Sequence, residues 1–140
     1  MDYDIAKMYY NIKNYKMALK FYNKNIEICV DKEMKFNSYL DMSKISLMME
    51  LDFHTSSLIY LTKALETCPK RAEPYILLSS WYYDKNELDI ANFYIKHACS
   101  LDIPKDLKYD KYLYNSFRWE LKKKICRLIN DKKNKKKERV

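Results

Sequence analysis

The chain has 140 residues, of which 48% are hydrophobic and 33% are charged. This balance is typical of one folded domain and not of a disordered chain. There is no glycine, which excludes glycine-rich phosphate loops, dinucleotide-binding fingerprints and EF-hand loops. A sheet protein of this size needs residues that accept positive φ in its tight turns. The composition therefore predicts an all-helical protein.

The formal net charge is +8, from 27 Lys and Arg against 19 Asp and Glu. Basic and acidic residues are equal in number from Met1 to Leu121, so the whole excess lies between Lys122 and Val140. The basic character therefore belongs to one end of the chain and does not indicate a basic domain face. After Ile129 the sequence has no apolar residue before the last, and residues 131–140 are predicted to be a basic tail that is either a frayed helix end or disordered.

The chain shows no pattern of a catalytic or metal site. The cysteines lie far apart, without the spacing of a zinc knuckle or a redox pair, and His54 and His97 have no neighbouring ligand set. We expect reduced thiols, no enzyme activity, no cofactor and no metal. No signal peptide or bilayer-spanning stretch is visible, so we expect a cytoplasmic protein. Abundant Lys, Tyr, Asn and Ile indicate an AT-rich genome, such as that of a large DNA virus or a protist; a viral protein would be in the host-cell cytoplasm or the virion.

Apolar residues recur at helical intervals along most of the chain. Residues 30–36 are predicted to be a loop or a helix extension, and Asp52 or Thr55 is a candidate N-cap for the helix that follows. Polar breaks and prolines separate the predicted helices, whose approximate ranges are 3–12, 15–28, 38–51, 55–67, 72–83, 88–101 and 109–129.

Small residues repeat at a helical-hairpin period. Ser57 and Ala91 are 34 residues apart, as are Ala64 and Ala98. The interval from Ala18 to Ser57 is 39 residues, five longer than this period. This period resembles that of the tetratricopeptide repeat, in which small residues let two helices approach closely. The resemblance implies an all-α, tetratricopeptide-like α-solenoid of three helical hairpins plus a C-terminal capping helix; the alternative is an irregular helical bundle. The expected repeats are about 2–31, 37–69 and 71–104, with the capping helix at about 107–130.

A narrower resemblance covers residues 70–125. The segments Arg71-Ala72-Glu73-Pro74, Trp81-Tyr82-Tyr83, Lys96-His97-Ala98, Asp102-Ile103-Pro104 and Trp119-Glu120-Leu121 are similar to a helical-repeat module found beside family 2 glycosyltransferase domains. This resemblance implies a helical architecture and a possible glycosyltransferase partner. It implies no catalysis, because the transferase itself needs a metal-binding Asp-x-Asp on a nucleotide-sugar fold; Asp2-Tyr3-Asp4 matches those letters at a chain end without a sheet.

The predicted function is a non-catalytic protein-interaction module, an adaptor or scaffold that binds a protein or peptide on the concave face of the first helices. Tyrosine and methionine suit such a face. Lys7 is its one basic residue, whereas capture of a peptide carboxylate would need several, so we expect apolar and tyrosine contacts. One alternative is an accessory module acting with a glycosyltransferase, and another is nucleic-acid or polyanion binding through the tail. The expected concave-face residues are Tyr3, Lys7, Tyr10, Asn11, Met42, Ser46, Met49, Ile76, Ser80 and Tyr83. The expected polyanion-binding residues are Lys132, Lys133, Lys135, Lys136, Lys137 and Arg139.

Overall fold

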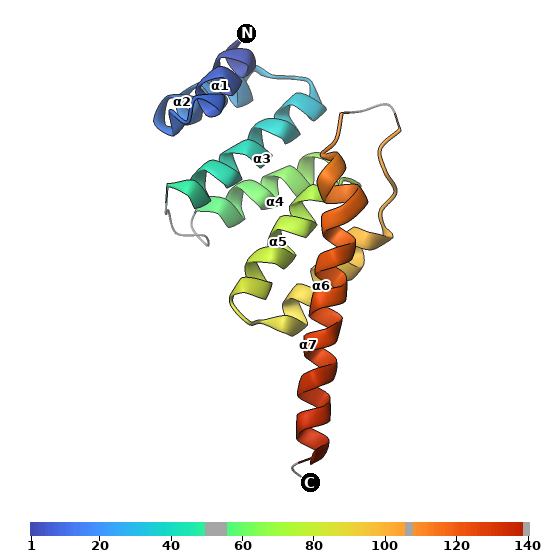
Figure 1. The fold of residues 1–140 in the computed structure, drawn as a ribbon. Helices are drawn as coiled ribbons and strands as arrows, with labels where there is room; N and C mark the ends of the chain where they lie inside the picture. The colour runs from blue at the N-terminus through green and yellow to red at the C-terminus, as the bar shows by residue number, and fades with distance from the viewer. Residues whose placement is uncertain (50–55, 106–107, 139–140) are drawn as a thin grey trace. The chain divides into compact units, whose positions relative to one another are not determined.

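The computed structural model describes residues 1–49, 56–105 and 108–138, and this part of the chain contains helices and turns but no strand (Figure 1). The prediction of an all-α protein is confirmed. The chain divides into two compact units, Met1–Pro69 and Lys70–Val140. The first unit holds α1 (Asp2–Asn11), α2 (Tyr15–Ile28), α3 (Lys32–Met48) and α4 (Leu58–Thr67); the second holds α5 (Glu73–Asp84), α6 (Leu88–Ser100), the π-helix η2 (Leu113–Phe117) and α7 (Arg118–Glu138).

In the first unit, α1 and α2 form a hairpin around two small residues. Ala6 and Ala18 are both fully buried, and for Ala18 this is what the repeat pattern predicted. Tyr9 on α1 stacks on Phe21 of α2, with the ring centroids 5.7 Å apart. The small side chains let the two helices approach, and the aromatic pair fills the space beside them.

The second hairpin of this unit, α3 and α4, begins with the helix extension that was one of the two alternatives for residues 30–36. The predicted helix starts at residue 38, whereas α3 begins at Lys32, where the Asp31 carboxylate accepts a hydrogen bond from the Met34 amide at 3.1 Å. This N-cap extends the helix through residues 32–36 and buries Phe36 completely. The Ser57 hydroxyl donates to the Ser43 carbonyl at 3.0 Å. Asp52, His54 and Thr55 lie outside the described residues.

In the second unit, α5 and α6 form a hairpin built on the same principle. Ser79 and Ala91 are fully buried, and the Ser79 hydroxyl donates to the Ala91 carbonyl at 2.7 Å. Ala91 therefore faces the partner helix, as predicted. Tyr82 stacks on Tyr94 at 5.9 Å, in the same way as the aromatic pair of the first hairpin.

Two non-glycine residues close the tight turns of these hairpins in the left-handed conformation. Lys13 follows α1 with φ of 63°, and Asn86 follows α5 with φ of 60°. The amides of Lys13 and Asn14 donate to carbonyls near the end of α1 at 3.0 and 2.9 Å, and Asn86 and Glu87 repeat this pattern after α5. This is the Schellman termination in which glycine usually stands.

The capping helix of the second unit contains a π-helical segment. η2 leads directly into α7, and the side chain of Arg118 at the junction is buried. Its Nε donates to the Tyr114 carbonyl at 2.7 Å, and its Nη1 donates to the carbonyls of Ala98 and Leu101 at 2.8 and 2.7 Å. One guanidinium group thus satisfies carbonyls both within its own helix and at the end of α6.

The last helix is longer than the sequence analysis expected. We expected the capping helix to end near residue 130 and residues 131–140 to be a frayed helix end or disordered, whereas α7 continues to Glu138. Lysine is a good helix former, and Lys135, Lys136 and Lys137 occupy the last turn, where positive charge complements the helix dipole. Within its unit, α7 extends well past the turn between α5 and α6 (Figure 1).

Candidate partner-binding surfaces

A buried carboxylate organises the first unit. Asp41 of α3 lies 3.0 Å from the Lys7 ammonium of α1, measured from Oδ2 to Nζ, and accepts a 2.6 Å hydrogen bond from the Tyr22 hydroxyl of α2. The side chain of Asp41 is 7% exposed and that of Lys7 is 43% exposed. Because the ion pair is partly solvated at its lysine end, it fixes the position of Lys7 more than it adds stability.

The tyrosines around this carboxylate remain neutral at physiological pH. Burial and the Asp41 charge, together with the hydrogen bond, raise the pKa of Tyr22 far above its ordinary value. Burial, and secondly the charge of Asp41, raise the pKa of Tyr3 to about 12. Tyr3 lies edge-on to Tyr22, with ring centroids 6.1 Å apart. The phenol groups therefore act here as hydrogen-bond donors and packing groups and carry no charge.

Beside this cluster lies a tyrosine–methionine surface, formed by Tyr10, Tyr15 and Met48. Tyr10 contacts Tyr15 edge-on at 6.1 Å, and the Tyr15 hydroxyl donates to the Met48 sulfur at 3.1 Å. Met48 is 61% exposed, and the two tyrosines are half-buried. The Lys7 ammonium lies 5.1 Å from the centroid of the Tyr10 ring. This surface combines adaptable apolar area with the Lys7 ammonium, whose charge is already paired with the Asp41 carboxylate.

Three of the residues predicted to line a partner-binding face are interior residues. Met42, Ser46 and Ile76 are fully buried, so the prediction that they contact a partner is wrong. The Ser46 hydroxyl is used within α3, where it donates to the Met42 carbonyl at 3.0 Å. A helical face assigned from spacing alone does not show how deeply neighbouring helices cover it.

The other predicted residues keep some accessible surface. In the first unit, Tyr3, Lys7 and Tyr10 are half-buried while Asn11 and Met49 are exposed; in the second unit, Ser80 and Tyr83 of α5 are half-buried.

Sequence reasoning missed Asp41, Tyr15 and Met48. The signal for Asp41 was present, because it is an acidic residue between Leu40 and Met42 in a helix that is otherwise apolar at these positions. A carboxylate in such a stretch needs a buried partner. No comparable signal marked Tyr15 or Met48, since their contact joins two helices that are distant in sequence.

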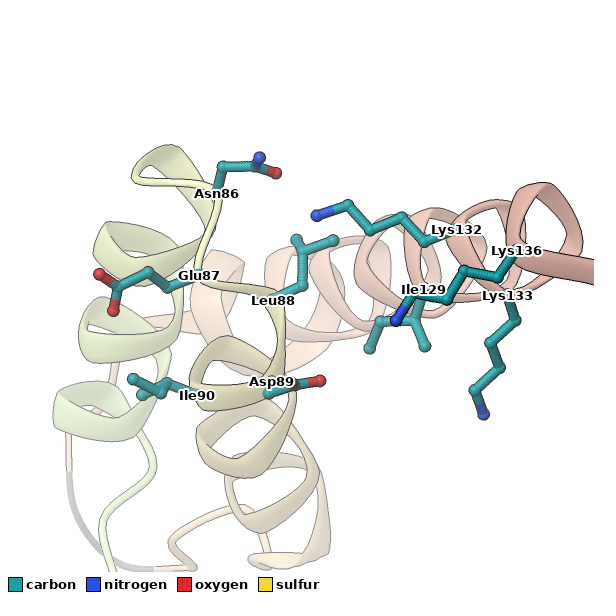
Figure 2. Close-up of a pocket in the computed structure, with 9 residues that line it drawn as sticks. All are labelled: Asn86, Glu87, Leu88, Asp89, Ile90, Ile129, Lys132, Lys133 and Lys136. Atoms are coloured by element: carbon teal, nitrogen blue, oxygen red, sulfur yellow. The ribbon is translucent and has the colours of Figure 1, made fainter. Parts of the chain in front are cut away.

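A groove in the second unit lies between the start of α6 and α7. Its volume is about 440 Å³. In Figure 2, Leu88 and Asp89 of α6 are directed toward α7, and Lys132 and Lys136 extend from α7. The full lining is Asn86, Glu87, Leu88, Asp89, Ile90, Ile129, Lys132, Lys133 and Lys136.

The basic residues predicted to bind polyanions are thus divided by the structure. Lys132, Lys133 and Lys136 line the groove, whereas Lys135 and Lys137 are exposed elsewhere on α7. Arg139 lies outside the described residues.

The described part of the chain shows neither a metal cluster nor a membrane span. No group of three His, Cys, Asp or Glu is placed to hold a metal ion within residues 1–49, 56–105 and 108–138. Over the same ranges, no helix combines the length and hydrophobicity that crossing a bilayer requires.

Comparison with known proteins identifies the fold. No protein-family model matches the chain, and no curated protein matches its sequence. Among solved structures it is similar to the Hsp90 co-chaperone Cns1 from Saccharomyces cerevisiae (delta69), with a TM-score of 0.70 and 20% identity. The match covers 99% of this chain and 41% of that chain. The likeness confirms the predicted all-α, tetratricopeptide-like fold.

Proposed function

We propose that this protein is a non-catalytic protein-interaction module, an adaptor or scaffold that binds a partner through the tyrosine–methionine surface of its first unit. The observation that carries the proposal is the contact chain from Tyr10 through Tyr15 to the exposed Met48. Tyrosine offers large contact area at low entropic cost, and methionine adapts to irregular partner surfaces.

The chemistry of this surface favours apolar and hydroxyl contacts over the capture of an anionic group. Lys7 is the one basic residue among the predicted partner-binding positions, and its ammonium already pairs with Asp41 at 3.0 Å. A partner carboxylate would have to compete with that buried acceptor, which also holds the Tyr22 hydroxyl. The partner segment proposed here is therefore apolar or aromatic.

Two partners are the first to be tried. Hsp90 is one, because the similar structure is that of an Hsp90 co-chaperone. A glycosyltransferase is the other, and this proposal depends on the resemblance of residues 70–125 alone. The proposed place of action is the cytoplasm, as expected for an adaptor of such partners.

The test is affinity capture from native cells followed by titration of the captured partner. The variant Tyr10→Ala/Met48→Ser removes the proposed contacts, and Ile28→Ser is a matched control because Ile28 is 73% exposed at the end of α2. A true partner should bind the control normally and the double variant about thirtyfold more weakly, as is typical of interface hot spots. Equal binding to both variants would contradict the proposal.

A second candidate function is polyanion binding through α7. The supporting observation is that Lys132 to Lys137 belong to a continuous helix, so their charges are displayed along a rigid support. Such binding should weaken steeply between low and physiological salt, because each phosphate contact releases counterions. Titration of heparin and of a DNA duplex at several salt concentrations tests this function, and a flat salt dependence would exclude it.

A further inference from the structure

One face of α7 changes its chemistry along its length. Leu121 and Ile125 are buried in the core of the second unit, and Ile129 packs against that core. Lys132, Lys133 and Lys136 follow Ile129 at intervals of three, four and seven residues, which keeps them on the same face of the helix. The face of α7 that carries buried apolar residues as far as Ile129 therefore carries lysines after it, beside the first turn of α6.

The groove under these lysines has an apolar floor. Leu88 and Ile129 contribute aliphatic side chains, and Ile90, which is 41% exposed, adds a third. A volume of about 440 Å³ lies within the range of sites that bury several apolar groups of a ligand. Leu88 is only 5% exposed, so the apolar surface that a ligand in the groove would cover comes mainly from Ile90 and the half-buried Ile129.

The lysines of the groove have unmatched charge. Within the described residues, no carboxylate lies at ion-pair distance from Lys132, Lys133 or Lys136. Asp89 stands in the first turn of α6, where a negative charge complements the helix dipole, and Glu87 is directed away from α7 in Figure 2. The groove therefore presents a positive wall over an apolar floor.

We propose that this groove docks an acidic amphipathic helical segment of a partner protein. Apolar side chains of the segment occupy the floor around Leu88 and Ile129, and its carboxylates face the three lysines. A nucleic-acid backbone fits less well, because it has no aliphatic side to cover the floor and would lie close to the Asp89 carboxylate. This second docking surface goes beyond the proposed function, which depends on the first unit.

The test uses a synthetic helical peptide of about twenty residues, long enough to be helical, with Leu on one face and Glu on the other. Its affinity is measured by fluorescence anisotropy against the full chain and two triple variants of equal charge change. Lys132→Gln/Lys133→Gln/Lys136→Gln removes the wall of the groove. Lys123→Gln/Lys124→Gln/Lys135→Gln is the control, because these three lysines are exposed and do not line the groove.

We expect the groove variant to bind the peptide about tenfold more weakly and the control variant to change affinity by less than about threefold. Replacing every Leu of the peptide by Gln should weaken binding to the wild type by at least about tenfold. Asp89→Asn should strengthen binding, an outcome that loss of folding cannot mimic. The proposal would be overturned if the two triple variants lost peptide affinity equally, or if replacing Leu in the peptide did not change its affinity. If a DNA duplex bound more tightly than the peptide, and the groove variant lost this DNA binding, the groove would be assigned to nucleic acid instead.

Discussion

The Tyr114 hydroxyl donates a 2.9 Å hydrogen bond to the Glu73 carboxylate across 41 residues of sequence. The same hydroxyl oxygen accepts the Ala72 amide at 2.7 Å, and Arg71 holds the carboxylate with two hydrogen bonds of 3.1 and 2.6 Å. Arg71, Glu73 and Tyr114 are all buried. The first turn of α5 is therefore joined to the capping helix by a buried polar network, which is costly when it is incomplete.

Tyr114→Phe should destabilise the protein by about 1–3 kcal/mol. The substitution leaves the Ala72 amide without its acceptor in a buried site, and it removes one of the two hydrogen bonds that Glu73 Oε1 accepts. The free energy of unfolding, measured by urea denaturation, checks this prediction. Tyr112→Phe is the control, because Tyr112 is 59% exposed. Equal stability of the two variants would show that the network does not hold the capping helix.

Ala91→Leu should cost about 1–3 kcal/mol of stability through overpacking. Ala91 is fully buried where the Ser79 hydroxyl meets its carbonyl, so additional methyl groups have no space between α5 and α6. Thermal denaturation measures the loss. Phe93→Leu, at a position that is 68% exposed on the same helix, should leave the melting temperature nearly unchanged. An unchanged melting temperature for Ala91→Leu would refute the helix contact.

Lys13→Gly should stabilise the protein by about 0.5–1 kcal/mol. Lys13 has φ of 63°, a conformation that glycine adopts without the steric cost of a Cβ atom. Lys20→Gly, an exposed position within α2, should instead destabilise by about 1 kcal/mol, because glycine is a poor helix former. Denaturant titration measures the change in the free energy of unfolding for each variant. A loss of stability in both variants would contradict the left-handed conformation assigned to Lys13.

Stability should fall as the pH rises from about 10 to about 12. Burial raises the pKa of Tyr3 and Tyr114 to about 12, whereas tyrosines in the unfolded chain lose their protons near pH 10. In this interval the folded state binds more protons, so the stabilisation present below pH 10 is lost progressively. Urea midpoints at about pH 9 and 11.5 measure the fall. Tyr3→Phe should reduce it, and an identical fall in wild type and variant would exclude Tyr3 as a cause.

Deletion of residues 131–140 should change the free energy of unfolding by less than about 0.5 kcal/mol. Every described residue of this segment is exposed, and the apolar stripe of α7 ends at Ile129. The deletion removes six basic and two acidic residues, so heparin affinity should decrease while partner binding at Tyr10 and Met48 persists. Loss of the protein partner with unchanged heparin binding would reverse the assignment of the two surfaces.

The repeat architecture was predictable because it depends on short-range spacing. Ala18, Ser57 and Ala91 occupy the predicted helix contacts, since only small side chains fit there whatever the rest of the fold does. The end of α7 was not predicted, because a lysine run reads equally as a solvated tail or as a helix with favourable last-turn charges.

The candidate surfaces were less predictable than the helices. Lys7 was identified, but its partner Asp41 lies 34 residues away, and nothing in local spacing links them. Met42 was assigned to the surface although α3 turns it inward. The groove at Leu88 combines residues of α6 with lysines more than forty positions later, so its existence depends on how α7 packs.

The π-helical segment Leu113–Phe117 sets the rotation of everything that follows it. A π-turn holds one residue more than an α-turn, so each later side chain is rotated by about 100° from its α-helical position. An in-frame deletion of the single codon for Asn115, an exposed residue, would remove that rotation. Ile125 and Lys132 would then turn away from α6 together. The chemistry of the groove is thus encoded partly in the length of a segment that ends about four helical turns before Lys132.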